Sequence, residues 1–269
     1  MWPQLIIVTL FAAIAQGVAG FSFTLLAVSF YLLILRSTDA VQLVILINFA
    51  ISAVLVSRLW RAVPPRLWAL LAGGGLLGFP FGLWLFARAN VELIELAVAG
   101  VTISFALAVL IREFLDSGRG ARLAAPDDEE GTHDGVGQTG RRGRDVAFRS
   151  ASALAVGVTA GAMTSSIGAP GPPVALYLTG LGLDKTTFRA LALSAFMVMQ
   201  TGSLFGQFVY VGIDPRVWGY ALVLIPVAGV GASAGHSLCH HVSERVFRRL
   251  ILLLLLATGA YLLHQALTG

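Results

Sequence analysis

Residues 161–180 read GAMTSSIGAPGPPVALYLTG, inside an uncharged run (residues 150–183) that is long enough to enter a membrane. The stretch holds four glycines and three prolines, which a straight helix does not tolerate well. Pro172 and Pro173 suit the first turn of a new helix, where their missing amides matter little. The pattern therefore predicts two half-helices that meet at an unwound turn.

An unwound turn inside a membrane cannot face lipid, because its backbone groups would lack hydrogen-bond partners, so it must line a cavity enclosed by protein. Three amides are expected to stay free there: those of Ala169, Gly171 and Val174. They would carry the positive end of a helix dipole, which favours an anion. The alternative is a kink that only packs helices.

The composition is that of a polytopic membrane protein. Of 269 residues, 57% are hydrophobic and 12% charged, and the mean hydropathy is +0.83. The net charge is +4, but the basic residues flank apolar runs, which argues against nucleic acid as a partner. Cys239 is the only cysteine, which excludes an internal disulfide and a cysteine-based metal site.

Hydropathy divides the chain into eight apolar elements around a polar linker. The first element, residues 1–35, is too long for one untilted span, and glycines and hydroxyls interrupt it. The others are residues 41–57, 67–87, 93–111, 150–183, 190–213, 217–239 and 250–268. The predicted domains are an N-terminal membrane repeat (1–112), a cytoplasmic linker expected to be disordered (113–148) and a C-terminal membrane repeat (149–269).

The two halves share four features in the same order, which indicates a duplication. Gly17 recurs as Gly161, PRLW at 65–68 as PRVW at 215–218, Gly78-x-x-x-Gly82 as Gly231-x-x-x-Gly235, and Glu92 as Glu244. The Gly-x-x-x-Gly pairs are expected to let neighbouring helices approach closely.

The two broken elements could each cross the membrane once or re-enter it as hairpins. Single crossings give parallel repeats and divide the 18 basic residues 11 to 7 between the two sides. Hairpins leave Arg36, Arg88 and Arg216 on one side and the other 15 opposite, which the positive-inside rule favours. The predicted fold is therefore an all-α polytopic membrane protein with two inverted four-element repeats and extracytoplasmic termini.

Few ionisable side chains are expected at depth, and Glu92 and Glu95 are expected to face water. A site of hydroxyls, amides and helix N-termini without a fixed counter-charge suits a small oxyanion. The predicted substrate-binding residues are Ser22, Thr24, Asn48, Thr164, Ser165, Ser166, Gly168, Pro170, Gly171, Ser194 and Gln200. The flanking Arg36, Lys185 and Arg189 either attract anions or anchor loops. No catalytic residue, metal or cofactor is predicted.

Two other classes of function stay open. His236 and His240 have the i, i+4 spacing that a metal could use, so a cation or metal transporter that also uses Glu244 is one alternative. The neighbouring arginines favour a basic membrane-surface patch instead. The second alternative is a non-transporting membrane assembly protein. An enzyme is disfavoured, because no G-x-S-x-G motif accompanies the serines.

The broken segments GVAGFSFTLLAVSFYLL (residues 17–33) and GAMTSSIGAPGPPVALYL (residues 161–178), in two halves around a hydrophilic linker, resemble the TauE/SafE sulfite exporter family of permeases. The resemblance covers essentially the whole chain. It implies a multi-pass protein of the bacterial inner membrane that moves a small sulfur-containing anion such as sulfite, a sulfonate or sulfoacetate.

The same resemblance places six residues in the family's signature segments: Gly17, Gly20, Gly161, Gly168, Pro170 and Pro172. Many members carry a run of glycines where this chain has Ser22-Phe23-Thr24, a departure that bears on the substrate more than on the fold. The expected partners are an anionic substrate and the lipid bilayer, and a homodimer is left open.

Overall fold

The structure, a computed structural model, describes residues 1–122, 138–238 and 244–268, and in these ranges every regular element is a helix. The helices are α1 (Trp2–Ala19), α2 (Phe23–Leu35), α3 (Asp39–Leu59), the 3-10 turn η1 (Trp60–Ala62), α4 (Pro65–Arg88), α5 (Val91–Arg122), α6 (Gln138–Ile167), α7 (Gly171–Thr179), α8 (Lys185–Tyr210), α9 (Pro215–Leu238) and α10 (Glu244–Thr268).

Six stretches of the described chain are long and apolar enough to cross a membrane. They are Asp39–Ala62, Pro65–Arg88, Val91–Ile111, Ser150–Ile167, Lys185–Tyr210 and Pro215–Leu238, and Trp2–Val18, Phe23–Leu35 and Ile251–Gln265 are shorter apolar helices. The prediction of an all-helical protein with several membrane spans is confirmed.

Both long apolar elements are interrupted where the glycines predicted a break. The first break separates α1 from α2 at residues 20–22, and the second separates α6 from α7 at residues 168–170. Helices α5 and α6 reach further into the predicted linker than expected, to Arg122 and from Gln138. Residues 123–137 lie outside the described residues, so the disorder of the linker stays a prediction.

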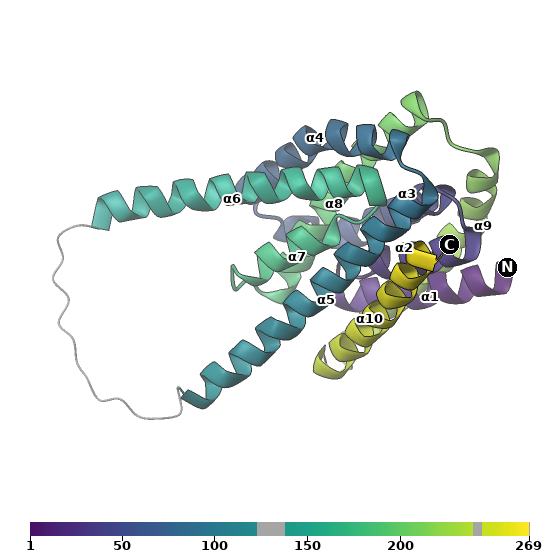
Figure 1. Ribbon diagram of the computed structural model, residues 1–269. Coiled ribbons are helices and arrows are strands. Elements are labelled where there is room, and N and C mark those ends of the chain that lie inside the picture. Colours follow the sequence, from purple (N-terminus) through teal and green to yellow (C-terminus); the bar gives the residue numbers. More distant parts are fainter. Residues whose placement is uncertain (123–137, 239–243, 269) are drawn as a thin grey trace.

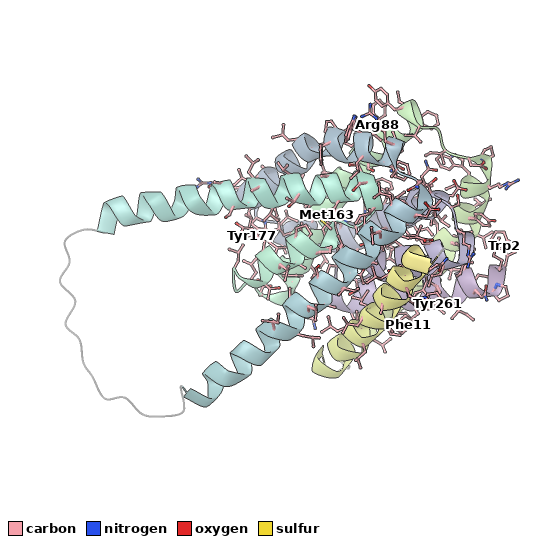
Figure 2. The ribbon with its side chains drawn as sticks, viewed as in Figure 1. Trp2, Phe11, Arg88, Met163, Tyr177 and Tyr261 are labelled. Atoms are coloured by element: carbon pink, nitrogen blue, oxygen red, sulfur yellow. The ribbon has the colours of Figure 1, made fainter. Side chains whose placement is uncertain are left out.

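Each broken element turns back on itself. In the first, Thr9 Oγ1 lies 2.6 Å from Tyr31 Oη, and Phe23 N donates to Gln16 Oε1 at 2.9 Å, so α1 and α2 run antiparallel. In the second, Figure 2 shows Tyr177 on α7 lying back toward the start of α6 relative to Met163, and the two helices are in contact.

The chain ends share one end of the helix bundle. In Figure 1 the N-terminus and the C-terminus lie at the right, whereas the last turn of α5 and the first turn of α6 lie at the left. We call these ends the terminal side and the linker side. Arg88 closes α4 at the terminal side (Figure 2), so α4 and α6 both run from the linker side to the terminal side.

The tightest packing is between α4 and α6, where glycines remove the side chains between the two helices. A Cβ added to Gly74 or Gly78 would collide with the backbone oxygen of Leu154 or Val158 on α6, and Gly161 faces α4 in the same way. The contacts advance together along both helices, so α4 and α6 run parallel. Small residues let the two backbones touch, as predicted.

Helices α1 and α9 form a second crossing of the same kind. A Cβ on Gly17 would collide with Ala232 O, and a Cβ on Gly235 would collide with Ile14 O. Both predicted Gly-x-x-x-Gly pairs therefore lie at helix crossings. Each crossing includes one of the helices that lead into a break, α6 in the first and α1 in the second.

We expect Gly74→Ala to destabilise the protein by about 1–3 kcal/mol, because the new methyl group would enter the backbone of α6. The neighbouring Gly73→Ala is the matched control, since a Cβ there has no neighbour within 4 Å. The control should be as stable as the parent protein or slightly more stable. Thermal unfolding of the purified variants in detergent measures both, and equal midpoints for the two would contradict the close crossing.

Candidate functional site

The two breaks share one backbone geometry. Gly20 has φ 89° and its amide donates to Gln16 O at 2.7 Å, whereas Gly168 has φ 73° and donates to Thr164 O at 3.0 Å. A positive φ with a bond four residues back is the left-handed cap that ends many helices, and it favours glycine. In both cases the next helix begins three residues after the glycine.

The two breaks touch each other. A Cβ added to Gly171, the first residue of α7, would lie 2.9 Å from Phe21 O in the first break. The Phe21 ring packs edge-on against Phe105 and Phe188, with centroid distances of 5.9 and 6.1 Å. We call residues 20–23 and 168–171 together the junction. Its backbone is enclosed by protein, as an unwound segment in a membrane requires.

Each break also packs on a long helix of the other half of the chain, the second break on α3 and the first break on α8. A Cβ on Gly168 would meet Val41 and Ile45 of α3 at 3.4–3.5 Å, and one on Gly20 would meet Arg189 Cγ of α8 at 2.8 Å. Gly20 and Gly168 are separated by 148 residues, and so are Val41 and Arg189. The two contacts are thus equivalent in position and different in charge.

Three buried polar side chains surround the first break. Gln16 accepts the amide of Phe23, so it satisfies an N–H that the start of α2 would otherwise leave without a partner. The Gln16 amide in turn lies 3.4 Å from Asn48 Oδ1. Asn48 Nδ2 and Ser22 Oγ are buried and have no hydrogen-bond partner. Two donors are therefore available next to the place where the breaks meet.

The three predicted hydroxyls of α6 are buried but already engaged. Thr164 donates to Ala160 O at 2.7 Å, and Ser166 donates to Ala162 O at 2.8 Å. Ser165 bonds Gly161 O within its own helix and also Phe79 O of α4. Hydroxyls bonded one turn back keep only acceptor capacity, so a solute could not receive their protons without breaking these bonds.

One of the three amides predicted to be free at the second break has a hydrogen-bond partner. Ala169 N donates to Met163 O at 3.2 Å, so the expectation for Ala169 was wrong. For the amides of Gly171 and Val174, at the start of α7, the expectation stays a prediction. Since Pro170, Pro172 and Pro173 have no N–H, Gly171 supplies the one amide of that turn.

Three other predicted residues lie on α2 and α8. Thr24 is buried in the first turn of α2. Ser194 lies on α8 and donates to Leu191 O at 3.1 Å. Gln200, further along α8, is fully buried, and neither of its amide atoms has a partner.

A positive charge lies against the first break, which contradicts the expectation of a site without a fixed counter-charge. Arg189 is 4% exposed, and its Nη2 donates to Gly17 O at 2.6 Å. The same nitrogen is 3.0 Å from His236 Nδ1, which must accept because a guanidinium only donates. Arg189 thereby satisfies a carbonyl in the last turn of α1, where a cation is favoured by the helix dipole.

Glu95 is a second correction. Glu92 is exposed as expected, but Glu95 is 4% exposed and falls on the buried stripe of α5 with Ile94 and Val98. Arg36, at the end of α2, lies close enough to act on its charge. Glu95 is buried because of the way α5 packs on α2 and α10, and hydropathy alone does not reveal which face of α5 makes these contacts.

Three further buried polar residues, Ser52, Ser203 and Gln207, are not among the predicted substrate-binding residues. A usable signal was present, because Asn48 and Ser52 are four residues apart, and Gln200, Ser203 and Gln207 follow at intervals of three and four. Such spacing places polar groups on one face of a helix. Gln207 donates to Ser165 O at 3.2 Å, at the end of α6.

We expect Gln16→Met to lower the free energy of unfolding by about 1–3 kcal/mol, because the buried amide of Phe23 would lose its acceptor. Gln4→Met is the matched control, since Gln4 lies on the same helix with an exposed side chain. The control should change stability little. Denaturation of both variants in detergent measures the difference, and equal values would contradict the capping role of Gln16.

In a comparison with protein-family models, residues 5–262 match the model described as Sulfite exporter TauE/SafE. Neither the search of curated proteins nor that of solved structures finds a match. The matched region includes both breaks, both glycine crossings and α3 and α8 between them. The chain therefore belongs to the TauE/SafE sulfite exporter family of membrane transporters.

Proposed function

We propose that this protein is a permease of the bacterial inner membrane that moves a small sulfur-containing oxyanion, of the sulfite, sulfonate or sulfoacetate type, bound at the junction. The observation that carries the proposal is the meeting of the two breaks, with Phe21 O against Gly171 and unpartnered donors beside them. Family membership supports the class of solute.

The chemistry of the junction suits an anion that must be released again. Ser22 Oγ, Asn48 Nδ2 and the Gly171 amide can each donate one hydrogen bond to an oxyanion. Arg189 adds a positive charge at the first break while its Nη2 is bound to Gly17 O. Neutral donors with one engaged cation attract an anion without the tight pairing that a free guanidinium would give.

We infer that the two halves are inverted repeats. The first helix of each half packs on the third long helix of the other, α1 on α9 and α6 on α4. The first helices, α1 and α6, run in opposite directions in Figure 1. Rocking of one half against the other would then expose the junction to each side in turn, the access mode of transporters built this way.

A metal transporter is less well supported. His236 Nδ1 faces the Arg189 guanidinium, which would repel a cation, and His240 lies outside the described residues. In the part of the chain that the structure describes, no group of three or more His, Cys, Asp or Glu side chains could hold a metal. The non-transporting alternative is separated from the permease by measuring flux.

Uptake of sulfite, thiosulfate, sulfate, sulfoacetate and taurine into proteoliposomes tests the proposal. At least one of the sulfur oxyanions should cross faster than in protein-free liposomes, and metal cations should not. Absence of flux for the whole panel, with correctly inserted protein, would favour the non-transporting alternative.

We expect Ser22→Ala to raise the KM for the transported anion about tenfold, the effect of losing one hydrogen bond to a charged group. Ser29→Ala is the matched control on the same helix, since Ser29 is buried and donates to Leu25 O at 2.8 Å within α2. Initial uptake rates at varied anion concentration give the KM of each variant. An unchanged KM in Ser22→Ala would remove Ser22 from the site.

A further inference from the structure

Five buried polar residues on α3 and α8 carry atoms without a hydrogen-bond partner. On α3 these are Asn48 Nδ2 and Ser52 Oγ, and on α8 they are both amide atoms of Gln200, Ser203 Oγ and Gln207 Oε1. All five side chains are fully buried. Buried polar groups almost always find partners, so a set of unpartnered ones needs something to bond, either solute or water.

The five residues lie at matching levels of two antiparallel helices in contact. Gln42 of α3 donates to Gly212 O, just after α8, at 2.9 Å, which fixes the register. Asn48 lies six residues after Gln42, and Gln207 lies five residues before Gly212. Ser52 and Ser203 follow at ten and nine residues from the same pair. With a rise of about 1.5 Å per residue, the two helices bring these groups to similar depths.

Both stripes also point toward the end of α6. Asn48 and Ser52 share a helical face with Val41 and Ile45, which contact Gly168. On α8, Gln207 reaches Ser165 O, three residues before Gly168. The polar faces of α3 and α8 therefore converge on the junction, and we call Asn48, Ser52, Gln200, Ser203 and Gln207 the polar seam.

The seam leads to an open depression at the terminal side. The depression has a volume of about 400 Å³ and is lined by Thr38, Asp39, Gln42 and residues 211–214. Its lining includes Gln42 and Gly212, which are bonded to each other, and the first seam residues lie less than two helical turns from them. Toward the linker side, the same face of α8 continues from Gln200 to Arg189 at the first break.

The geometry points to the polar seam as the pathway by which the solute and its water pass between the terminal-side depression and the first break. This inference rests on the proposed function and extends it from a binding junction to a route. The five side chains of the polar seam are neutral and offer both hydrogen-bond donors and acceptors. They can therefore replace the water molecules around a small oxyanion one after another as it moves along the seam. Residues 52, 203 and 207 thereby gain a role in transport.

Cysteine accessibility tests the route in the full-length protein. In a Cys239→Ser background, Ser52→Cys and Ser203→Cys place a thiol in the seam with little change in size. Ser29→Cys is the matched control, a buried serine on α2 whose hydroxyl bonds its own helix. The probes are 2-sulfonatoethyl methanethiosulfonate, an anionic sulfonate, and its cationic trimethylammonium analogue, added to proteoliposomes.

The expected result is that the sulfonate reagent modifies both seam cysteines in folded protein, severalfold faster than the cationic reagent does. Ser29→Cys should react only after denaturation in SDS. The route is overturned if neither seam cysteine reacts with the sulfonate although both react fully in SDS, or if the cation reacts as fast. If one seam variant fails to insert, the other gives the same decision.

Anion flux through the Cys239→Ser background separates this inference from the function it extends. Flux with unreactive seam cysteines would overturn the route and leave the permease proposal standing. Reactive seam cysteines in a protein that moves no sulfur oxyanion would support an anion-accessible seam and overturn the permease. If the route and the permease function are both correct, modification of a seam cysteine should abolish most of the anion flux. The same reagent should leave the flux through Ser29→Cys unchanged.

Discussion

A helix that is broken inside a membrane leaves amides and carbonyls that lipid cannot satisfy, and this constraint organises the molecule. At both breaks a glycine with positive φ returns its amide to the preceding turn, to Gln16 O or Thr164 O. The groups that remain find partners from far along the chain, Phe23 N in Gln16 and Gly17 O in Arg189. The prolines opening α7 solve the same problem by removing donors altogether.

Close backbone contact keeps these breaks away from lipid. Helices α4 and α6 touch through glycines, and so do α1 and α9, so no lipid chain can enter between the two helices of either pair. The junction forms between these two crossings, where Gly171 has no side chain to push it away from Phe21 O. Packing by small residues and satisfaction of backbone groups are thus parts of one arrangement.

The position of the breaks could be predicted from sequence because it depends on local chemistry. Glycine and hydroxyl residues clustered within an uncharged run locate residues 20–22, and the same residues together with prolines locate residues 168–170 in a second run. The Gly-x-x-x-Gly pairs likewise predicted close helix crossings. These features are properties of the residues themselves, and they hold whatever lies next to them.

The residues that line the candidate site depend on which side of each helix faces inward. Composition does not reveal this orientation. Glu95 was expected in water and is buried, because the stripe of α5 that includes Ile94 and Val98 packs inward. The guanidinium of Arg189 meets Gly17 O across 172 residues of sequence, and no local pattern records such a contact. Ser52 and Ser203 were not predicted as site residues for the same reason, since a serine on a helix indicates a polar site only when the direction of its helical face is known.

Arg189 brings a buried positive charge to the first break, where its guanidinium bonds Gly17 O in the last turn of α1. A cation in the last turn of α1 partly compensates the negative end of that helix, so its field at the junction is smaller than that of an isolated guanidinium. The equivalent position at the second break holds Val41, which adds no charge. Under the proposed function, an anion at the junction is therefore held mainly by the neutral donors of Ser22, Asn48 and Gly171 and attracted toward the first break by Arg189. Under the same proposal, a second arginine in place of Val41 would hold the anion more tightly and slow its release.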